Sequence, residues 1–121
     1  MISEPVLFAA KAFLCWDALR DLSVQLVPVR EAAAYYYPPS NRRHSIIVFY
    51  TPGKRDLSEP FFLLFHEAGH ACQWNAGNKA GREQTFHELI DTPSGKDKCI
   101  FEHEAWERGR ELLERFMHRH G

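Results

Sequence analysis

Cysteine is scarce in this sequence, and long apolar runs are missing. The three cysteines, Cys15, Cys72 and Cys99, are odd in number and form no C-x-x-C pair. This argues against a disulfide framework and against a zinc site made of thiolates, and it favours a reducing compartment. No segment approaches the roughly 20 consecutive apolar residues that a membrane-spanning helix needs. We therefore expect a soluble, cytoplasmic protein with no membrane segment.

The chain also lacks an excess of charge of either sign, internal repeats and linker-like stretches. Its 15 Lys and Arg residues nearly balance 16 Asp and Glu residues, so no overall field attracts nucleic acid or an anionic membrane surface. Apolar residues make up 45% of the 121 positions, as in an ordinary folded protein. We expect a single domain over residues 1–121, with no direct nucleic-acid partner.

The first half of the chain predicts a helix followed by strands. Apolar positions recur at near-helical spacing from residue 4 to about residue 21, with Ser3 as the N-cap. Residues 23–27 and 46–50 are rich in β-branched side chains and bounded by turn residues, which is typical of strands. A polar stretch at residues 40–43 precedes the second of these strands.

The second half predicts further helices. Residues 61–74 are apolar around most of a helix circumference, which indicates a central, buried helix, and Ser58 stands at the expected N-cap. Residues 75–99 predict a long irregular connection with a short helix near residues 83–89. A final amphipathic helix begins at about Lys98. This order of elements indicates an α+β fold.

The segment His66-Glu67-Ala68-Gly69-His70 lies within the predicted central helix. Residues four apart share a helix face, about 6 Å apart along the axis, so both imidazoles can reach one ion. Zinc accepts imidazole nitrogen as a ligand. Glu67 is rotated by about 100° from His66, which places its carboxylate beside the ion, where a general base for metal-bound water must stand.

The setting of this motif strengthens its interpretation. An H-E-x-x-H pattern arises by chance in histidine-rich sequences, but here three ionisable groups interrupt an otherwise apolar helix and need a shared partner. The pattern therefore predicts a bound zinc ion. Metzincin proteases require glycine and histidine three and six residues after the second histidine. Gln73 and Ala76 occupy those positions, which excludes this class.

The third ligand is expected from a later helix, because a catalytic zinc site usually has three protein ligands. Glu104 is the best candidate, since Ala105 and Gly109 supply a smooth surface for docking against the helix that carries the histidines. Glu102 is an alternative to Glu104. Residues two apart point to nearly opposite helix faces, so only one of these two glutamates can reach the ion. His87 is a weaker alternative.

Together these features resemble the ImmA/IrrE family of small gluzincin peptidases. The resemblance rests on a strand, the Phe-His-Glu-x-Gly-His segment and the Glu-x-Glu-Ala segment, and in element order it spans roughly residues 20–115. It implies a minimal zincin-like domain, with about three helices packed on a small, mainly antiparallel sheet. It also implies that Zn²⁺ binds His66, His70 and Glu104. Glu67 would be the catalytic base, and the substrates would be proteins, often DNA-binding repressors.

The function expected from these features is hydrolysis of peptide bonds, in which zinc-bound water gives a proton to Glu67 and attacks a peptide carbonyl. We expect the substrate to lie extended beside residues 46–50, at the edge of the sheet. His103 and Tyr50 are further candidates for stabilising the oxyanion. Two alternatives stay open: a zinc-binding interaction module without catalysis, and a pseudoenzyme that depends on a partner protein.

Overall fold

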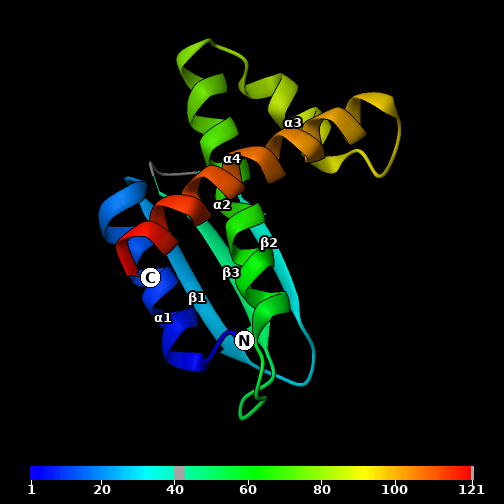
Figure 1. Ribbon diagram of the computed structural model, residues 1–121. Coiled ribbons are helices and arrows are strands. Elements are labelled where there is room, and N and C mark those ends of the chain that lie inside the picture. Colours follow the sequence, from blue (N-terminus) through cyan, green and yellow to red (C-terminus); the bar gives the residue numbers. More distant parts are fainter. Residues whose placement is uncertain (40–42, 121) are drawn as a thin grey trace.

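The described part of the chain forms four α-helices and a three-stranded sheet, so the α+β class is confirmed. The family resemblance implied about three helices, and the short helix expected near residues 83–89 brings the number to four. The computed structural model describes residues 1–39 and 43–120; residues 40–42, part of the polar stretch expected before a strand, and residue 121 lie outside it. In chain order the elements are α1 (Glu4–Phe13), a π-helical turn (Leu14–Ala18), β1 (Leu22–Pro28), β2 (Ala33–Tyr37), β3 (His44–Tyr50), α2 (Ser58–Lys79), α3 (Glu83–Asp91) and α4 (Lys96–His120) (Figure 1). Over the described ranges, no helix combines the length and the apolar character needed to cross a membrane.

The sheet is mixed rather than mainly antiparallel. Its strand order is β1-β3-β2, and β3 pairs parallel with β1 and antiparallel with β2. The chain reverses direction after β1 and again after β2, so β1 and β3 run the same way, and β3 lies between the two earlier strands. Residues 46–50, which we expected at the sheet edge, therefore belong to the central strand. Their backbone is paired on both sides, so a substrate cannot add to them.

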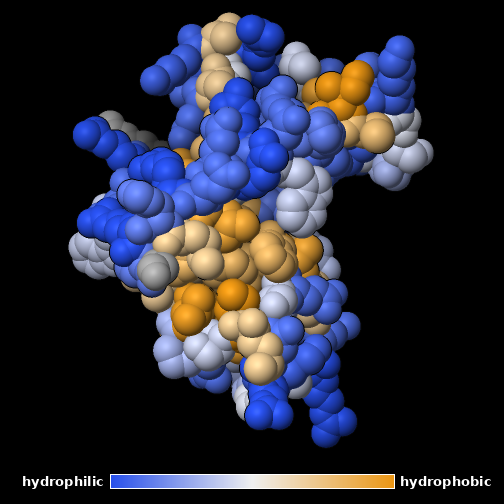
Figure 2. Space-filling view, in the orientation of Figure 1, coloured by the Kyte–Doolittle hydropathy of each residue, from blue (hydrophilic) through white to orange (hydrophobic). Residues whose placement is uncertain are grey.

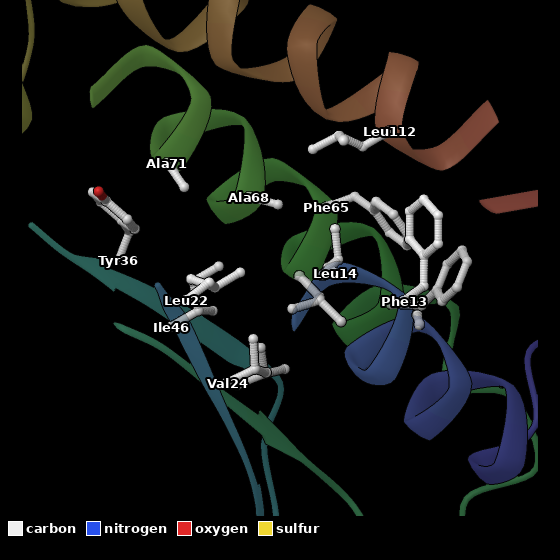
Figure 3. Close-up of a cluster of buried hydrophobic side chains, with 14 of the residues drawn as sticks. Phe13, Leu14, Leu22, Val24, Tyr36, Ile46, Phe65, Ala68, Ala71 and Leu112 are labelled. Atoms are coloured by element: carbon white, nitrogen blue, oxygen red, sulfur yellow. The ribbon is translucent and has the colours of Figure 1, made fainter. Parts of the chain in front are cut away.

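One face of the sheet is buried beneath helices. Along β3, His44, Ile46, Val48 and Tyr50 are at most 5% exposed, and the residues between them are partly exposed, which is the alternation of a strand with one covered face. Helices α1 and α2 lie over this face, and their apolar side chains meet those of the strands in one core (Figure 3). Helix α4 lies across α2 on the side away from the sheet, and its outward surface is hydrophilic (Figure 2).

The first helix begins as predicted and ends early. Ser3 Oγ accepts a hydrogen bond from the Val6 N–H at 3.4 Å, which confirms the N-cap. The helical chain stops after the π-helical turn, at Ala18, rather than at about residue 21. Leu19 follows with a φ of −130° and a ψ of 133°, an extended conformation that ends the helical chain.

Helix α2 differs from expectation at both ends. It runs on past residue 75 and is followed by α3, so most of residues 75–99 is helical, and Gly81, with a φ of +73°, makes the break between the two helices. At the start of α2, Ser58 is the first helical residue and not the N-cap. Its hydroxyl and its backbone N–H both donate to Asp56 Oδ1, at 2.6 and 3.1 Å, so the carboxylate of Asp56 binds the first turn.

Helices α2 and α4 cross with their backbones in contact. A Cβ added to Gly69 would overlap the backbone carbonyl oxygen of Ala105, and one added to Gly109 would overlap that of Phe65. Both glycines lie inside helices, where glycine costs about 1 kcal/mol relative to alanine. The absence of a side chain permits the close approach, which sets the histidine-bearing turns of α2 against the first half of α4.

Replacing Gly69 with alanine should force the two helices apart. We expect Gly69→Ala to lower the free energy of unfolding by about 1 to 3 kcal/mol, the usual cost of overpacking a tight contact, as measured by urea denaturation. Gly77→Ala in the same helix is the control, because its Cβ would lie 3.8 Å from the Arg82 carbonyl oxygen, an ordinary contact. We expect this control to be neutral or to stabilise by up to about 1 kcal/mol. Equal stability of the two variants would contradict the close crossing.

Candidate metal centre

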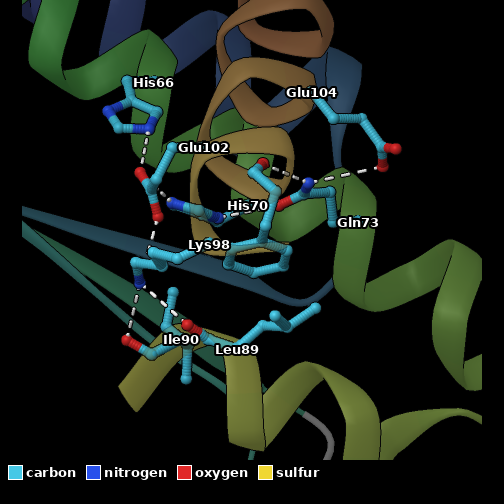
Figure 4. Close-up of polar contacts among 9 residues, drawn as sticks. His66, His70, Gln73, Leu89, Ile90, Lys98, Glu102 and Glu104 are labelled. Carbon is cyan, nitrogen blue, oxygen red and sulfur yellow. Dashed lines mark hydrogen bonds and ion pairs between the residues drawn. The ribbon is translucent and has the colours of Figure 1, made fainter. Parts of the chain in front are cut away.

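Three side chains from two helices bring potential metal ligands together. His66 and His70, on successive turns of α2, have ring centroids 4.9 Å apart, which confirms that they share a face. Glu102 of α4 approaches both: its Oε1 lies 2.9 Å from His66 Nε2 and 3.2 Å from His70 Nε2 (Figure 4). The ligand atoms of the three residues lie within 4.8 Å of one another, so the group could hold a metal ion.

The donor set of this group fits a divalent cation. Within residues 1–39 and 43–120, His66 Nε2 is the one buried side-chain nitrogen or oxygen that has no hydrogen-bond partner. It lies close to Glu102 Oε1, but the contact does not have the direction of a hydrogen bond. A cation would satisfy the imidazole nitrogen and the carboxylate oxygen together, and zinc takes both as ligands.

Burial keeps both imidazoles neutral, which is the form that binds a metal. Burial and the neighbouring His70 lower the pKa of His66 to about 4, and burial also lowers the pKa of His70. For Glu102, burial acts to raise the pKa, but His70, Lys98 and His66 outweigh it, and the pKa of this carboxyl falls below its ordinary value. At neutral pH the group therefore presents two neutral imidazoles and one carboxylate.

Glu104, the third ligand that we preferred from the sequence, is not part of this group. Its half-exposed carboxylate accepts a hydrogen bond from Gln73 Nε2 at 3.3 Å and pairs with Arg108 Nε at 3.4 Å. The row of α4 that touches α2 runs between the two glutamates, so only Glu102 lies on the side of the histidines. Residues two apart cannot both reach one ion, and the structure places the alternative, Glu102, there.

The other candidates from the sequence lie elsewhere. His87 is exposed on α3, and the group that could hold a metal does not include it. His103 is exposed on α4 and pairs with Glu107 at 3.0 Å. Tyr50 is buried at the end of β3, where its ring packs against α1. Neither His103 nor Tyr50 is therefore in position to assist chemistry at the histidines.

Glu67 lies between the two histidines in sequence but is not one of the three grouped ligands. Burial and the negative charge of Glu102 raise the pKa of Glu67 to about 8, and Lys98 acts in the opposite direction. A bound cation would favour the carboxylate and lower this pKa. Glu67 is thus a buried carboxyl that senses the charge of Glu102.

The ring of His70 is held by aromatic neighbours and by a hydrogen bond at Nδ1, the ring nitrogen that faces away from Glu102. Its ring packs against Tyr36 of β2, with centroids 6.3 Å apart, and against Phe101 of α4, with centroids 4.9 Å apart. His70 Nδ1 lies 2.7 Å from Gln73 Oε1, and Gln73 Nε2 donates to the Phe101 carbonyl oxygen at 2.8 Å. Because a backbone carbonyl only accepts, the amide nitrogen of Gln73 must face it, and the amide oxygen accepts the Nδ1 proton of His70. This leaves the Nε2 lone pair for a metal.

Gln73 is a further residue of the candidate site, and the sequence did not single it out as one. Its signal in the sequence is a polar amide three residues after His70 on an otherwise apolar helix, where a buried amide needs partners. The identity of those partners, however, depends on which segment of α4 packs above it.

Trp106 covers the other histidine. Its indole stacks on the His66 ring, with centroids 4.2 Å apart and an angle of 17° between the planes, and it remains 44% exposed. Trp106, Glu102 and Lys98 are spaced four apart on α4 and so form one row on the helix surface. This row presents an indole, a carboxylate and an ammonium group toward the histidine side of the crossing.

Comparison of the chain with protein-family models, with curated proteins and with solved structures gives no match. The resemblance to the ImmA/IrrE peptidases therefore rests on the two motifs and the order of the elements, and it stays a prediction.

Separate removal of the two glutamates tests which of them completes the ligand set. We expect Glu102→Ala to lose zinc affinity by more than the roughly 10- to 100-fold that a change outside the ligand shell costs. Glu104→Ala, two residues along the same helix, should retain zinc. Zinc content after dialysis, measured by atomic emission, distinguishes them. Loss of zinc from the Glu104 variant alone would restore the ligand set that the family resemblance implies.

Removal of the Gln73 amide should weaken metal binding without touching a ligand. We expect Gln73→Leu to reduce zinc affinity by about 10- to 100-fold, because His70 loses the group that fixes its tautomer. Competition with a chromophoric chelator gives the affinity. Gln84→Leu is the matched control, since Gln84 is exposed on α3 and contacts only Glu88 of its own helix among the described residues. Equal affinities of the two variants would contradict an orienting role for Gln73.

Proposed function

We propose that the protein is a zinc-dependent metallopeptidase of the gluzincin type, with His66, His70 and Glu102 as metal ligands and Glu67 as the general base. The observation that carries this proposal is the meeting of two neutral imidazoles and a carboxylate. Glu67 is a buried carboxyl outside this group, close enough to Glu102 for its negative charge to raise the pKa of Glu67. Within the described ranges the group offers three candidate protein ligands. Catalytic zinc sites have three, whereas structural sites are closed by four, which favours catalysis over a structural role.

The chemistry divides between the ion and the chain. When bound, zinc would lower the pKa of a water molecule and polarise the carbonyl of the substrate. Glu67 would accept a proton from the attacking water at its carboxylate and release it to the nitrogen of the leaving amine. Gln73 keeps the proton of His70 on Nδ1, so that Nε2 remains available to the ion throughout.

The substrate of such a site would be an extended segment of a protein. Strand β2 is the outer strand next to the metal group, because its Tyr36 packs against His70. An extended peptide that added to the outer edge of β2 would run past the histidines and pair through its backbone. This position replaces the one that we expected beside β3. A flexible segment of a DNA-binding repressor, which the family resemblance implies, would meet this requirement.

Substitution of the general base separates catalysis from metal binding. We expect Glu67→Gln to lose about 10²- to 10⁴-fold in the rate of cleavage, which is the usual contribution of a general base, and to keep the zinc content of the wild type. Fluorescently labelled casein, which is extended and flexible, serves as the substrate. Glu59→Gln is the control, because Glu59 is exposed in the first turn of the same helix.

The outcomes of this experiment discriminate between the functions. A Glu67→Gln variant that cleaves as well as the wild type would overturn the assignment of the base. Wild-type protein that binds zinc but cleaves neither casein nor a peptide library would support the interaction module in place of the peptidase.

A further inference from the structure

Lys98 contacts the carboxylate of Glu102 from the side opposite the histidines. Its Nζ lies 3.2 Å from Glu102 Oε2, whereas Oε1 of the same carboxylate faces His66 and His70. Nζ also donates to the carbonyl oxygens of Leu89 and Ile90, at 2.9 and 3.0 Å (Figure 4). Lys98 thus joins the third ligand to the end of α3.

The three contacts use every donor of the Lys98 side chain. An ammonium group has three N–H donors and no acceptor, and here the three acceptors are one carboxylate oxygen and two backbone carbonyls. The two carbonyls lie at the C-terminal end of α3, where the helix dipole attracts a cation. The side chain is 16% exposed. No donor is left for the oxyanion of a substrate, so Lys98 is not placed to act on the reacting atoms.

We propose that Lys98 is a positioning residue, which holds Oε2 of Glu102 so that Oε1 is presented to the metal and which anchors this carboxylate to the C-terminal end of α3. The inference rests on the metal site of the proposed function and adds a residue that no feature of the sequence indicated. Because the ammonium group of Lys98 binds both Glu102 and the end of α3, an ion that holds Glu102 in place should also hold the end of α3 in place.

A simple charge effect predicts the opposite sign. If Lys98 were only a positive charge near a cation, its removal would relieve repulsion, and the metal would bind more tightly. If Lys98 positions the ligand, its removal frees the carboxylate to rotate, and the metal binds more weakly, by about 10- to 100-fold for such outer-shell partners. The direction of the change in affinity therefore decides between the two roles.

The test is the zinc affinity of the full chain, measured by competition with a chromophoric chelator for the wild type and three variants. We expect Lys98→Met to bind zinc about 10- to 100-fold more weakly. Lys98→Arg retains the charge but cannot place three donors on the same acceptors, so we expect an intermediate loss. Lys96→Met is the matched control, because Lys96 is an exposed lysine of the same first turn, and its affinity should equal that of the wild type.

A second measurement needs only the wild-type chain and therefore holds even where Lys98→Met fails to fold. Hydrogen exchange of α3 amides is compared with and without zinc. We expect zinc to slow exchange near the end of α3, because a fixed Glu102 holds Lys98 and, through it, the last carbonyls of the helix. Exchange in α3 that zinc does not alter would overturn the anchoring role.

The failure of this inference is distinguishable from the failure of the proposed function. Unchanged or tighter zinc binding by Lys98→Met, with a wild type that binds zinc, would overturn the positioning role and leave the metal site intact. A wild type that binds no zinc would overturn both.

Discussion

Helices α2 and α4 meet with their backbones in contact at Gly69 and Gly109, and the candidate metal centre lies beside this crossing. A side chain at either glycine would separate the helices and withdraw Glu102 from the histidines, which reach it by contacts of about 3 Å. Glycine inside a helix is unfavourable by itself. Both glycines stand where the helix that carries the histidines touches the helix that carries Glu102, so this cost accompanies the close approach of the candidate ligands.

The crossing also determines the surroundings of each row of side chains on α4. The row that contains Ala105 and Gly109 is occupied by contact with α2. The row on one side, Lys98, Glu102 and Trp106, faces the histidines, and the row on the other side carries Glu104. Two glutamates only two residues apart therefore have different environments. One joins the candidate ligands, and the other is half-exposed and accepts a hydrogen bond from Gln73.

Buried polar groups around the site have partners that fix them in place. Gln73 ties His70 to a backbone carbonyl of α4, and Lys98 ties Glu102 to backbone carbonyls of α3. Tyr36 packs against His70 from the sheet and hydrogen-bonds to His44 on β3 at 2.9 Å. A polar group that is buried without a partner is costly. Among the described residues, His66 Nε2 is the exception, and a cation would satisfy it.

Local patterns in the sequence were sufficient for the helices in outline, for strands β1 and β3 and for the centre of the site, whereas β2 was not among the predicted strands. The helical period places His66 and His70 on one face in any structure that keeps this helix, and the β-branched run at residues 46–50 forms a strand in the structure. The apolar segment around the histidines forms the helix that is packed between the sheet and α4. These features depend on neighbours within a few residues of each other, and so the sequence by itself determined them.

Only the tertiary structure decided which remote segments meet. β3 is central because it pairs with both β1 and β2, and local spacing does not determine that pairing. The choice of Glu102 over Glu104 follows from the side of the contact row on which α2 carries its histidines. The partners of Gln73 and Lys98 follow in the same way. Spacing along α4 fits Glu102 and Glu104 equally well, so it cannot show which of them faces the histidines. Packing between the helices decides this, because it turns one side of α4 toward α2.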